Sequence, residues 1–120
     1  GLDVTEQVSL LSREFEFLRE RGTAGRFFCE LMDFYGRNAA FFGAEGCVMH
    51  DPCAVAWLLQ PQLFSGRRGR VNVVLSGEER GRTVLEENPH GSVLVLDRAE
   101  AARAGELIVR SIDLLCSPRE

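Results

Sequence analysis

The sequence predicts an α/β architecture in which helices flank an incomplete parallel sheet, with a β-hairpin extension between residues 70 and 90. Apolar residues recur at helical spacing in four segments, near residues 13–21, 23–36, 52–60 and 98–115. Short runs rich in valine and leucine predict strands near residues 70–75, 82–86 and 93–97. We expect a single domain over residues 1–120, because this length is ordinary for one domain.

The N-terminal part is expected to finish a strand and then form a short helix. Residues 2–4 are too few for a complete strand and are interpreted as the last residues of one. Leu11, Phe15 and Leu18 fall at i, i+4 and i+7, so residues 13–21 are predicted to form an amphipathic helix.

The helix predicted near residues 23–36 carries an unusually wide apolar face. Two stripes at helical spacing run along it side by side, Phe27-Leu31-Phe34 and Phe28-Met32-Tyr35. An aromatic face of this width predicts that the helix is buried against a large surface.

Turn residues and apolar runs define the remaining elements. Asp51 and Pro52 precede an apolar run, which is typical of a helix with aspartate at its N-cap and proline in its first turn. Gly77 and Gly81 bracket the connection of the predicted hairpin. Residues 93–96 are apolar on both faces, which indicates an interior strand, and the long C-terminal helix is expected to pack on the sheet.

Composition argues against several classes of function. Acidic and basic residues are interspersed and the net charge is -4, so the basic stripe typical of nucleic-acid-binding proteins is absent. No apolar run reaches the length of about 18 residues that predicts a membrane span. The cysteines are interpreted as free thiols of a cytoplasmic protein, because the chain has enough apolar residues for a core; they are Cys29, Cys47, Cys53 and Cys116.

The strongest candidate for chemistry is the tripeptide His50-Asp51-Pro52. It places an imidazole beside a carboxylate where a glycine-rich loop enters an apolar helix, and catalytic groups often lie in such loops. Structural roles explain the same residues, with Asp51 as a helix cap and His50 as an ordinary loop residue. A zinc site formed by Cys47, His50 and Cys53 is a further alternative, although structural zinc usually takes four ligands.

A longer motif around this tripeptide resembles a known family. The run from Gly43 to Ala56 is similar to the histidine-aspartate-proline signature of the inosine-uridine nucleoside hydrolases, and the segment from Leu58 to Gly66 is similar to the helix and turn after that signature. Two further blocks resemble the same family, Leu2-Asp3-Val4-Thr5 and Gly81-Arg82-Thr83-Val84. The likeness spans nearly the whole chain and corresponds to the C-terminal part of a Rossmann-like family member.

The resemblance implies hydrolysis of the N-glycosidic bond of a purine or pyrimidine ribonucleoside to base and ribose. It implies a calcium ion that holds the attacking water, with Asp51 as one ligand, and a catalytic role for His50 at the departing base. Tyr35 matches a region whose aromatic residues stack on the base, although a core position explains this residue equally well.

The chain also departs from the family pattern. The cluster Asp-x-Asp-x-x-x-Asp-Asp, which supplies most metal ligands, is absent, and so are the later residues that bind ribose. One aspartate cannot hold calcium, which takes about six to eight oxygens. We therefore expect the chain to be inactive alone and to form a homo-oligomer or join a missing N-terminal segment. The alternative is a non-catalytic module that pairs with itself or with a partner.

Overall fold

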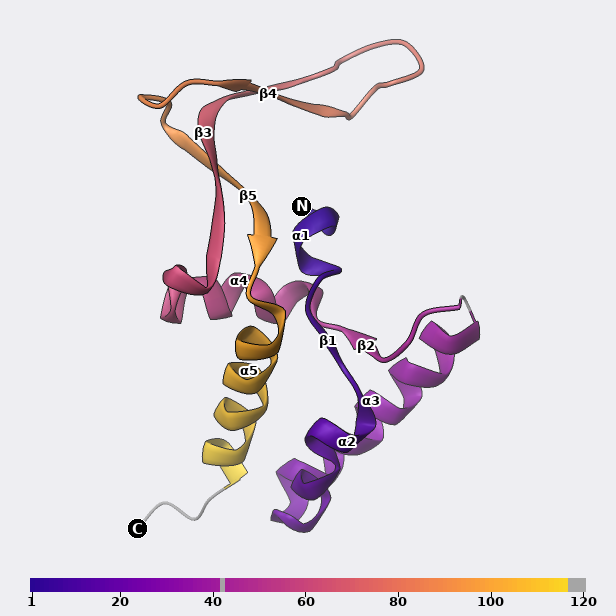
Figure 1. The fold of residues 1–120 in the computed structure, drawn as a ribbon. Coiled ribbons are helices and arrows are strands. Elements are labelled where there is room, and N and C mark those ends of the chain that lie inside the picture. The colour runs from indigo at the N-terminus through magenta and orange to yellow at the C-terminus, as the bar shows by residue number, and fades with distance from the viewer. Residues whose placement is uncertain (42, 117–120) are drawn as a thin grey trace.

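The computed structural model describes residues 1–41 and 43–116, and Figure 1 shows how their helices and strands are arranged. The helices are α1 (Leu2–Thr5), α2 (Ser12–Phe15), η1 (Glu16–Glu20), α3 (Gly22–Phe41), α4 (His50–Leu59), η2 (Pro61–Leu63) and α5 (Ala101–Cys116). The strands are β1 (Ser9–Leu10), β2 (Cys47–Val48), β3 (Phe64–Val73), β4 (Thr83–Glu87) and β5 (Val93–Ala99). The helices form one body, and the hairpin of β3 and β4 projects from it.

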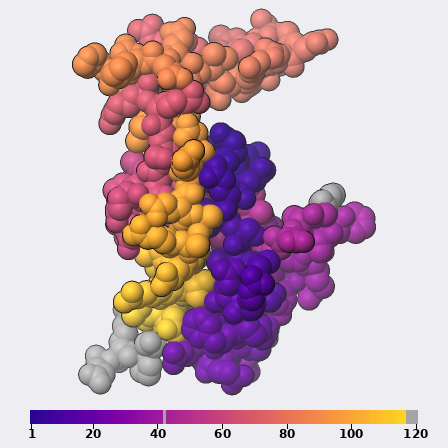
Figure 2. Space-filling view, viewed as in Figure 1, coloured from indigo at the N-terminus to yellow at the C-terminus, as the bar shows by residue number. Residues whose placement is uncertain are grey.

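The molecule is flat and elongated, with extents of 49 × 36 × 20 Å and a radius of gyration of 17.2 Å. A compact domain of this length has a radius of gyration of about 14 Å. The exposed area is 8825 Å², whereas a compact protein of this mass exposes about 6500 Å². The space-filling view shows the hairpin extending beyond the helical body (Figure 2). Much surface that a compact domain buries is therefore open in this chain.

One apolar core joins the N-terminal segments to the long helices. Its largest fully buried side chains come from β1, α2, η1 and η2, and include Leu10, Phe15, Leu18 and Leu63. Phe15 meets Phe28 of α3 edge to face, with ring centroids 5.8 Å apart. Apart from Phe64, which is 9% exposed, the strands β3, β4 and β5 contribute no buried side chain among the described residues. The core therefore lies in the helical body, and the hairpin lies outside it.

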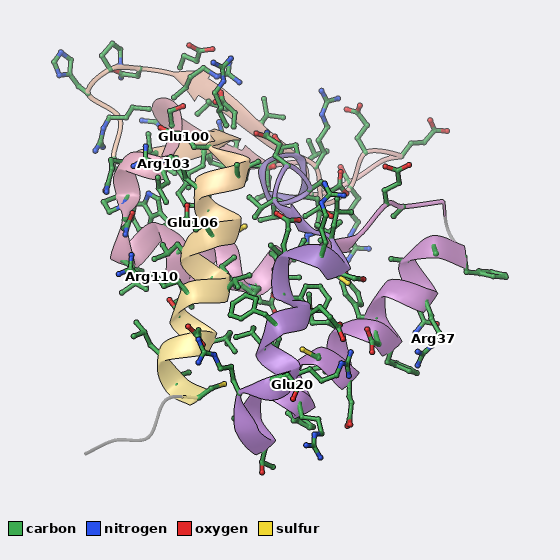
Figure 3. All side chains as sticks on the ribbon, turned by 60° about the horizontal axis from the view of Figure 1, so that its bottom comes forward. Glu20, Arg37, Glu100, Arg103, Glu106 and Arg110 are labelled. Carbon is green, nitrogen blue, oxygen red and sulfur yellow. The ribbon has the colours of Figure 1, made fainter. Side chains whose placement is uncertain are left out.

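Charged side chains stay on the surface of this body. Figure 3 labels six that are exposed on or beside the helices: Glu20, Arg37, Glu100, Arg103, Glu106 and Arg110. No helix in the described part of the chain is long and apolar enough to cross a membrane.

The antiparallel pair of β1 and β2 brings the N-terminal segment to the start of α4. Ser9 pairs with Val48, and the N–H of Met49 extends the pairing by donating to the carbonyl of Val8 at 2.8 Å. Gly46 turns the chain into β2 with φ of 82°, and a side chain there would overlap Ser9. The residues just before β1 therefore lie beside the first residues of α4.

The second sheet has β3 in the centre, with β4 and β5 antiparallel on its two sides. This arrangement confirms the predicted α/β class with a hairpin extension. Every strand pair among the described residues is antiparallel, so the expected parallel pairing is not formed there. Parallel neighbours need a long crossover, usually a helix, and no helix joins β3 to β4 or β4 to β5.

The strand expected in the interior, β5, lies at an edge of this sheet. Val93 and Leu94 are 40% and 37% exposed. Apolar residues on both faces of a strand predict that both faces are covered. They do not predict whether the strand has a neighbouring strand on one side or on two. The expectation of an interior position was therefore wrong.

Three further expectations about helices need correction. Residues 2–4 belong to α1 and not to a strand. The N-cap of α4 is Met49, so Asp51 lies inside the first turn and not at the cap; the helix dipole favours an acidic residue at either position, so sequence does not separate them. The C-terminal helix α5 packs mainly against α3, α4 and β1 and not on the three-stranded sheet.

Candidate active site

His50 stands where β2 ends and α4 begins. It is the first residue of α4 and follows Met49, which is 4% exposed and is hydrogen-bonded through its N–H to Val8. The backbone before the ring is therefore held by β1, and the backbone after it by the helix. His50 itself is half-buried, so its ring can be held by the protein and still reach a ligand.

The Nδ1 atom of His50 lies 2.7 Å from the Oγ1 atom of Thr5. Thr5 is the last residue of α1 and is half-buried. Sequence analysis did not identify Thr5 as a site residue. The two residues are 45 positions apart, so their contact leaves no local signal, and the resemblance of residues 2–5 to a family block was the only pointer to this segment.

His50 and Thr5 line a hollow of about 510 Å³ formed by α1, α4 and β5. Its remaining walls are largely apolar and include Trp57 of α4 with Leu94 and Leu96 of β5. A flat apolar group loses unfavourable contact with water in such a hollow, while the two polar residues can fix its orientation.

Asp51 follows His50 in the sequence but opens onto a different hollow. Successive residues of a helix point about 100° apart, and Asp51 lines a groove of about 480 Å³ between α3, α4 and α5. The groove is mostly apolar, with Leu31, Val55 and Leu59 among its lining residues. The structure therefore brings His50 and Asp51 into one helical turn but not into one pocket.

Tyr35 lies on α3, is 37% exposed and lines neither of these hollows. Its neighbours Phe27, Leu31 and Phe34 are 65%, 52% and 59% exposed. The aromatic face of α3 was expected to be buried, and in this chain a large part of it is open because no described element covers it.

The described residues do not gather the ligands of a metal site. Within residues 1–41 and 43–116, no three histidine, cysteine, aspartate or glutamate side chains gather as a possible metal site. The Sγ of Cys47 donates to the carbonyl of Met32 at 3.3 Å, and His50 contacts Thr5. Burial raises the pKa of the Cys47 and Cys53 thiols, which disfavours the thiolates that zinc needs.

Calcium does not fit the described residues by themselves. Asp51 offers one exposed carboxylate at the N-terminal end of α4. Calcium takes about six to eight oxygen ligands. Among the described residues, Asp51 does not gather with two further histidine, cysteine, aspartate or glutamate side chains, so these residues alone do not form a calcium site near this helix.

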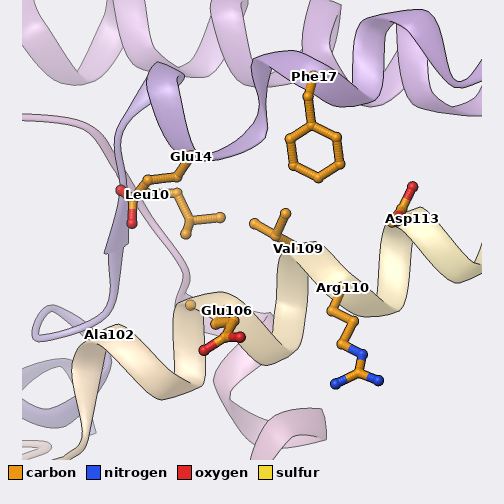
Figure 4. A pocket seen from close by; sticks show the side chains of 9 residues that line it. Leu10, Glu14, Phe17, Ala102, Glu106, Val109, Arg110 and Asp113 are labelled. Carbon is orange, nitrogen blue, oxygen red and sulfur yellow. The ribbon is translucent and has the colours of Figure 1, made fainter.

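A further hollow, of about 380 Å³, lies between α5 and the segment of α2 and η1 (Figure 4). Leu10, Phe17 and Val109 form its apolar part, and the carboxylates of Glu14 and Glu106 border it. None of the candidate site residues from the sequence lines it. It is separate from the hollow that contains His50.

Comparison with known proteins shows which family the chain belongs to. The profile described as inosine-uridine preferring nucleoside hydrolase matches residues 1–113. The chain is 33% identical over 107 residues to the pyrimidine-specific ribonucleoside hydrolase RihA of Photobacterium profundum, covering 81% of this chain and 34% of the relative. The protein of the same description from Citrobacter koseri is 33% identical over 109 residues, covering 82% and 35%. The chain thus spans about a third of the length of these relatives.

Solved structures show the same relationship. A purine-preferring ribonucleoside hydrolase from Gardnerella vaginalis matches with a TM-score of 0.84 and 29% identity, over 97% of this chain and 39% of that chain. A plant nucleoside hydrolase matches with a TM-score of 0.77 and 18% identity, over 94% and 40%, and this second likeness concerns the fold alone. Nearly all of the present chain therefore has the fold of a part of those larger chains.

Proposed function

Because the chain belongs to the inosine-uridine preferring nucleoside hydrolase family, we propose that it forms part of an enzyme that hydrolyses the N-glycosidic bond of ribonucleosides. The products are a free purine or pyrimidine base and ribose. The observation that carries the proposal is the placement of His50, half-buried beside Thr5 in a hollow with apolar walls. Such walls suit a flat aromatic base.

In this proposal His50 protonates the departing base. As the bond between C1′ and the base nitrogen breaks, its electron pair moves to the base, and a proton from the imidazole ring neutralises the developing negative charge. The oxygen of a water molecule forms the new bond to C1′, and that water gives up a proton to a base outside the described residues, which balances the proton that His50 delivers to the leaving base. A positioned acid of this kind is worth about 10²- to 10⁴-fold in rate.

Asp51 is proposed as one carboxylate of a calcium site in the complete enzyme. Calcium would hold the attacking water and make it more acidic. The described residues do not form such a site, so the other oxygen ligands must come from further protein. A loss of calcium dependence in Asp51→Asn would support the assignment, and unchanged dependence would contradict it.

Tyr35 is proposed to stack on the base. Its ring is partly exposed, but it lines neither the hollow of His50 nor the groove of Asp51. Replacement by phenylalanine should preserve substrate KM and replacement by alanine should raise it. Equal KM values in both variants would contradict stacking.

Further protein is also proposed to cover the open face of α3 and α4. The exposed area exceeds that of a compact protein of this mass by more than the roughly 800 Å² that each partner buries in a standard interface. The matched solved hydrolase extends well beyond this chain, so the rest of the hydrolase fold is the preferred cover and a second copy is the alternative. We accordingly propose that the chain alone is inactive. Its free cysteines suit the cytosol.

A non-catalytic interaction module is the second candidate function. The apolar groove between α3, α4 and α5 favours it, because exposed apolar surface of this kind is typical of association sites. In this case the half-buried His50 and its hollow would have no role in chemistry.

One experiment separates the two functions. The protein expressed from the complete gene, and the 120-residue chain alone and mixed with the remaining part of a RihA relative, are assayed for ribose release from uridine and inosine with calcium. The first function predicts release by the complete protein or by the mixture, and loss of that release in the His50→Ala variant. Association without ribose release in any arm would favour the second function and overturn the first.

A further inference from the structure

The hydroxyl group of Thr5 has three polar neighbours. Its Oγ1 atom lies 2.7 Å from Nδ1 of His50, 3.3 Å from the carbonyl oxygen of Leu2 and 3.4 Å from that of Gly1. The hydroxyl carries one proton and two lone pairs. It can therefore donate to only one of these three neighbours at a time.

The number of hydrogen bonds that can form favours one of the two possible directions of the contact between Thr5 and His50. If Thr5 donates to Nδ1, its oxygen accepts no hydrogen bond from the described residues, and both carbonyl contacts are lost. If Nδ1 carries the hydrogen and donates to Oγ1, the hydroxyl proton remains free for the carbonyl of Leu2, as threonine in a helical turn often does. The second arrangement makes two hydrogen bonds where the first makes one.

The fold holds Thr5 in place independently of His50. The side-chain amide of Gln7 donates to the carbonyls of Asp3 and Asp97, each at 2.9 Å. Its oxygen accepts from the N–H of Ala99, also at 2.9 Å. Gln7 thus ties α1 to β5, the two elements that flank the hollow, and this connection limits how far Thr5 can move away from the ring.

We propose that Thr5 is the positioning residue of His50, accepting a hydrogen bond from Nδ1 so that Nε2 is the nitrogen that meets the departing base. In the doubly protonated ring Nε2 carries the proton that the base receives, and the neutral ring left behind has its hydrogen on Nδ1. No described residue hydrogen-bonds to Nε2. The hydrogen bond to Thr5 is present both before and after Nε2 gives up a proton, so the ring need not turn during the reaction. The importance of this role for catalysis rests on the proposed function; the tautomer does not.

Nitrogen-15 NMR of the histidine rings tests the tautomer directly. Protonated and unprotonated ring nitrogens have well-separated shifts, so the neutral ring of His50 should show its hydrogen on Nδ1 in the unmodified protein and in Thr5→Ser. Thr5→Val has nearly the same shape but cannot accept a hydrogen bond, and should shift the ring toward the form with hydrogen on Nε2. Thr83→Val, at the exposed start of β4, is the matched control and should leave the spectrum of His50 unchanged.

Kinetics in the protein from the complete gene test the consequence. Thr5→Val should lower kcat about tenfold or more for uridine, since hydrogen bonds to a charged group contribute on this scale, while KM changes little. A riboside with a nitrophenol leaving group, which needs no proton, should be hydrolysed at nearly the normal rate, and Thr5→Ser should restore most activity on uridine.

The outcomes separate the two proposals. Hydrogen on Nε2 in the unmodified protein, or an unchanged tautomer in Thr5→Val, overturns the positioning role. Equal losses on uridine and on the nitrophenyl riboside also overturn it, because they indicate a general structural effect. Absence of any nucleoside hydrolysis contradicts the proposed function, and the NMR result still decides whether Thr5 sets the tautomer.

Discussion

The two faces of α4 differ in how far the other described elements of the chain surround them. On one face His50 contacts Thr5, and α1, α4 and β5 surround a hollow with polar and apolar walls. On the other face Asp51 borders an apolar groove where Val55 and Leu59 remain 57% and 61% exposed. The surroundings of His50 are thus assembled within the chain, whereas the groove beside Asp51 stays open among the described residues.

The strongest effect is expected on the face of α4 that carries His50. In the protein from the complete gene, His50→Ala should lower kcat for a nucleoside with a poor leaving base by about 10²- to 10⁴-fold, the contribution of a positioned acid. His90→Ala, at an exposed position beyond β4, is the matched control and should retain full activity. A rate of ribose release unchanged in His50→Ala would exclude the acid role.

A smaller effect, on the free energy of unfolding, is expected at Met49, the residue between β2 and His50. Met49 is 4% exposed, precedes His50 and lines the groove of Asp51. Met49→Ala should lower the free energy of unfolding by about 2–5 kcal/mol, because it leaves a cavity in the core. Leu59→Ala, on the exposed wall of the same groove, should change it by less than about 0.5 kcal/mol. Urea unfolding measures both, and equal losses would show that the groove is covered in solution.

The carboxylate of Asp51 should stabilise the chain only slightly. It lies in the first turn of α4, where the helix dipole favours negative charge. Asp51→Asn should lower the free energy of unfolding by about 0.3–1 kcal/mol at low ionic strength, and added salt should reduce the difference. Glu86→Gln, on β4 outside any helix, is the control. A larger loss that persists in high salt would mean that Asp51 has a structural partner.

The smallest effect at neutral pH concerns the buried thiols. Burial is the main cause that raises the pKa of Cys29, Cys47 and Cys53. A cysteine of the unfolded chain loses its proton near pH 8.5, so above that pH the folded state binds more protons and its stability falls. Urea unfolding at pH 7 and pH 9.5 should show the fall, and Cys53→Ala should reduce it. An identical fall in the variant would contradict the assignment to Cys53.

Local patterns predicted part of the structure well. The valine-rich runs around Gly77 and Gly81 predicted the hairpin, because glycine turns and β-branched residues act over a few positions. The same local reasoning placed β5 in a sheet interior and residues 2–4 in a strand, and both placements were wrong. The neighbours of a strand and the fold of a short terminal segment depend on contacts with distant segments. A pattern of about six adjacent residues contains no information on those contacts.

The candidate site shows the same division. Sequence identified His50 and Asp51 as candidates because an imidazole beside a carboxylate at a helix start forms a contiguous motif that resembles a family signature. Thr5 was missed, since its contact with His50 is made through the pairing of β1 with β2. The separation of His50 and Asp51 into two hollows was also missed, because it depends on which elements pack on each face of α4.

Sequence alone was enough to specify the family, the α/β class and the motif at the start of α4, since each is written in residues that are adjacent or regularly spaced. Tertiary packing was needed to settle the partner of His50, the antiparallel pairing of the strands and the openness of the aromatic face of α3. Those features depend on which distant segments pack together, and packing is a property of the whole folded chain.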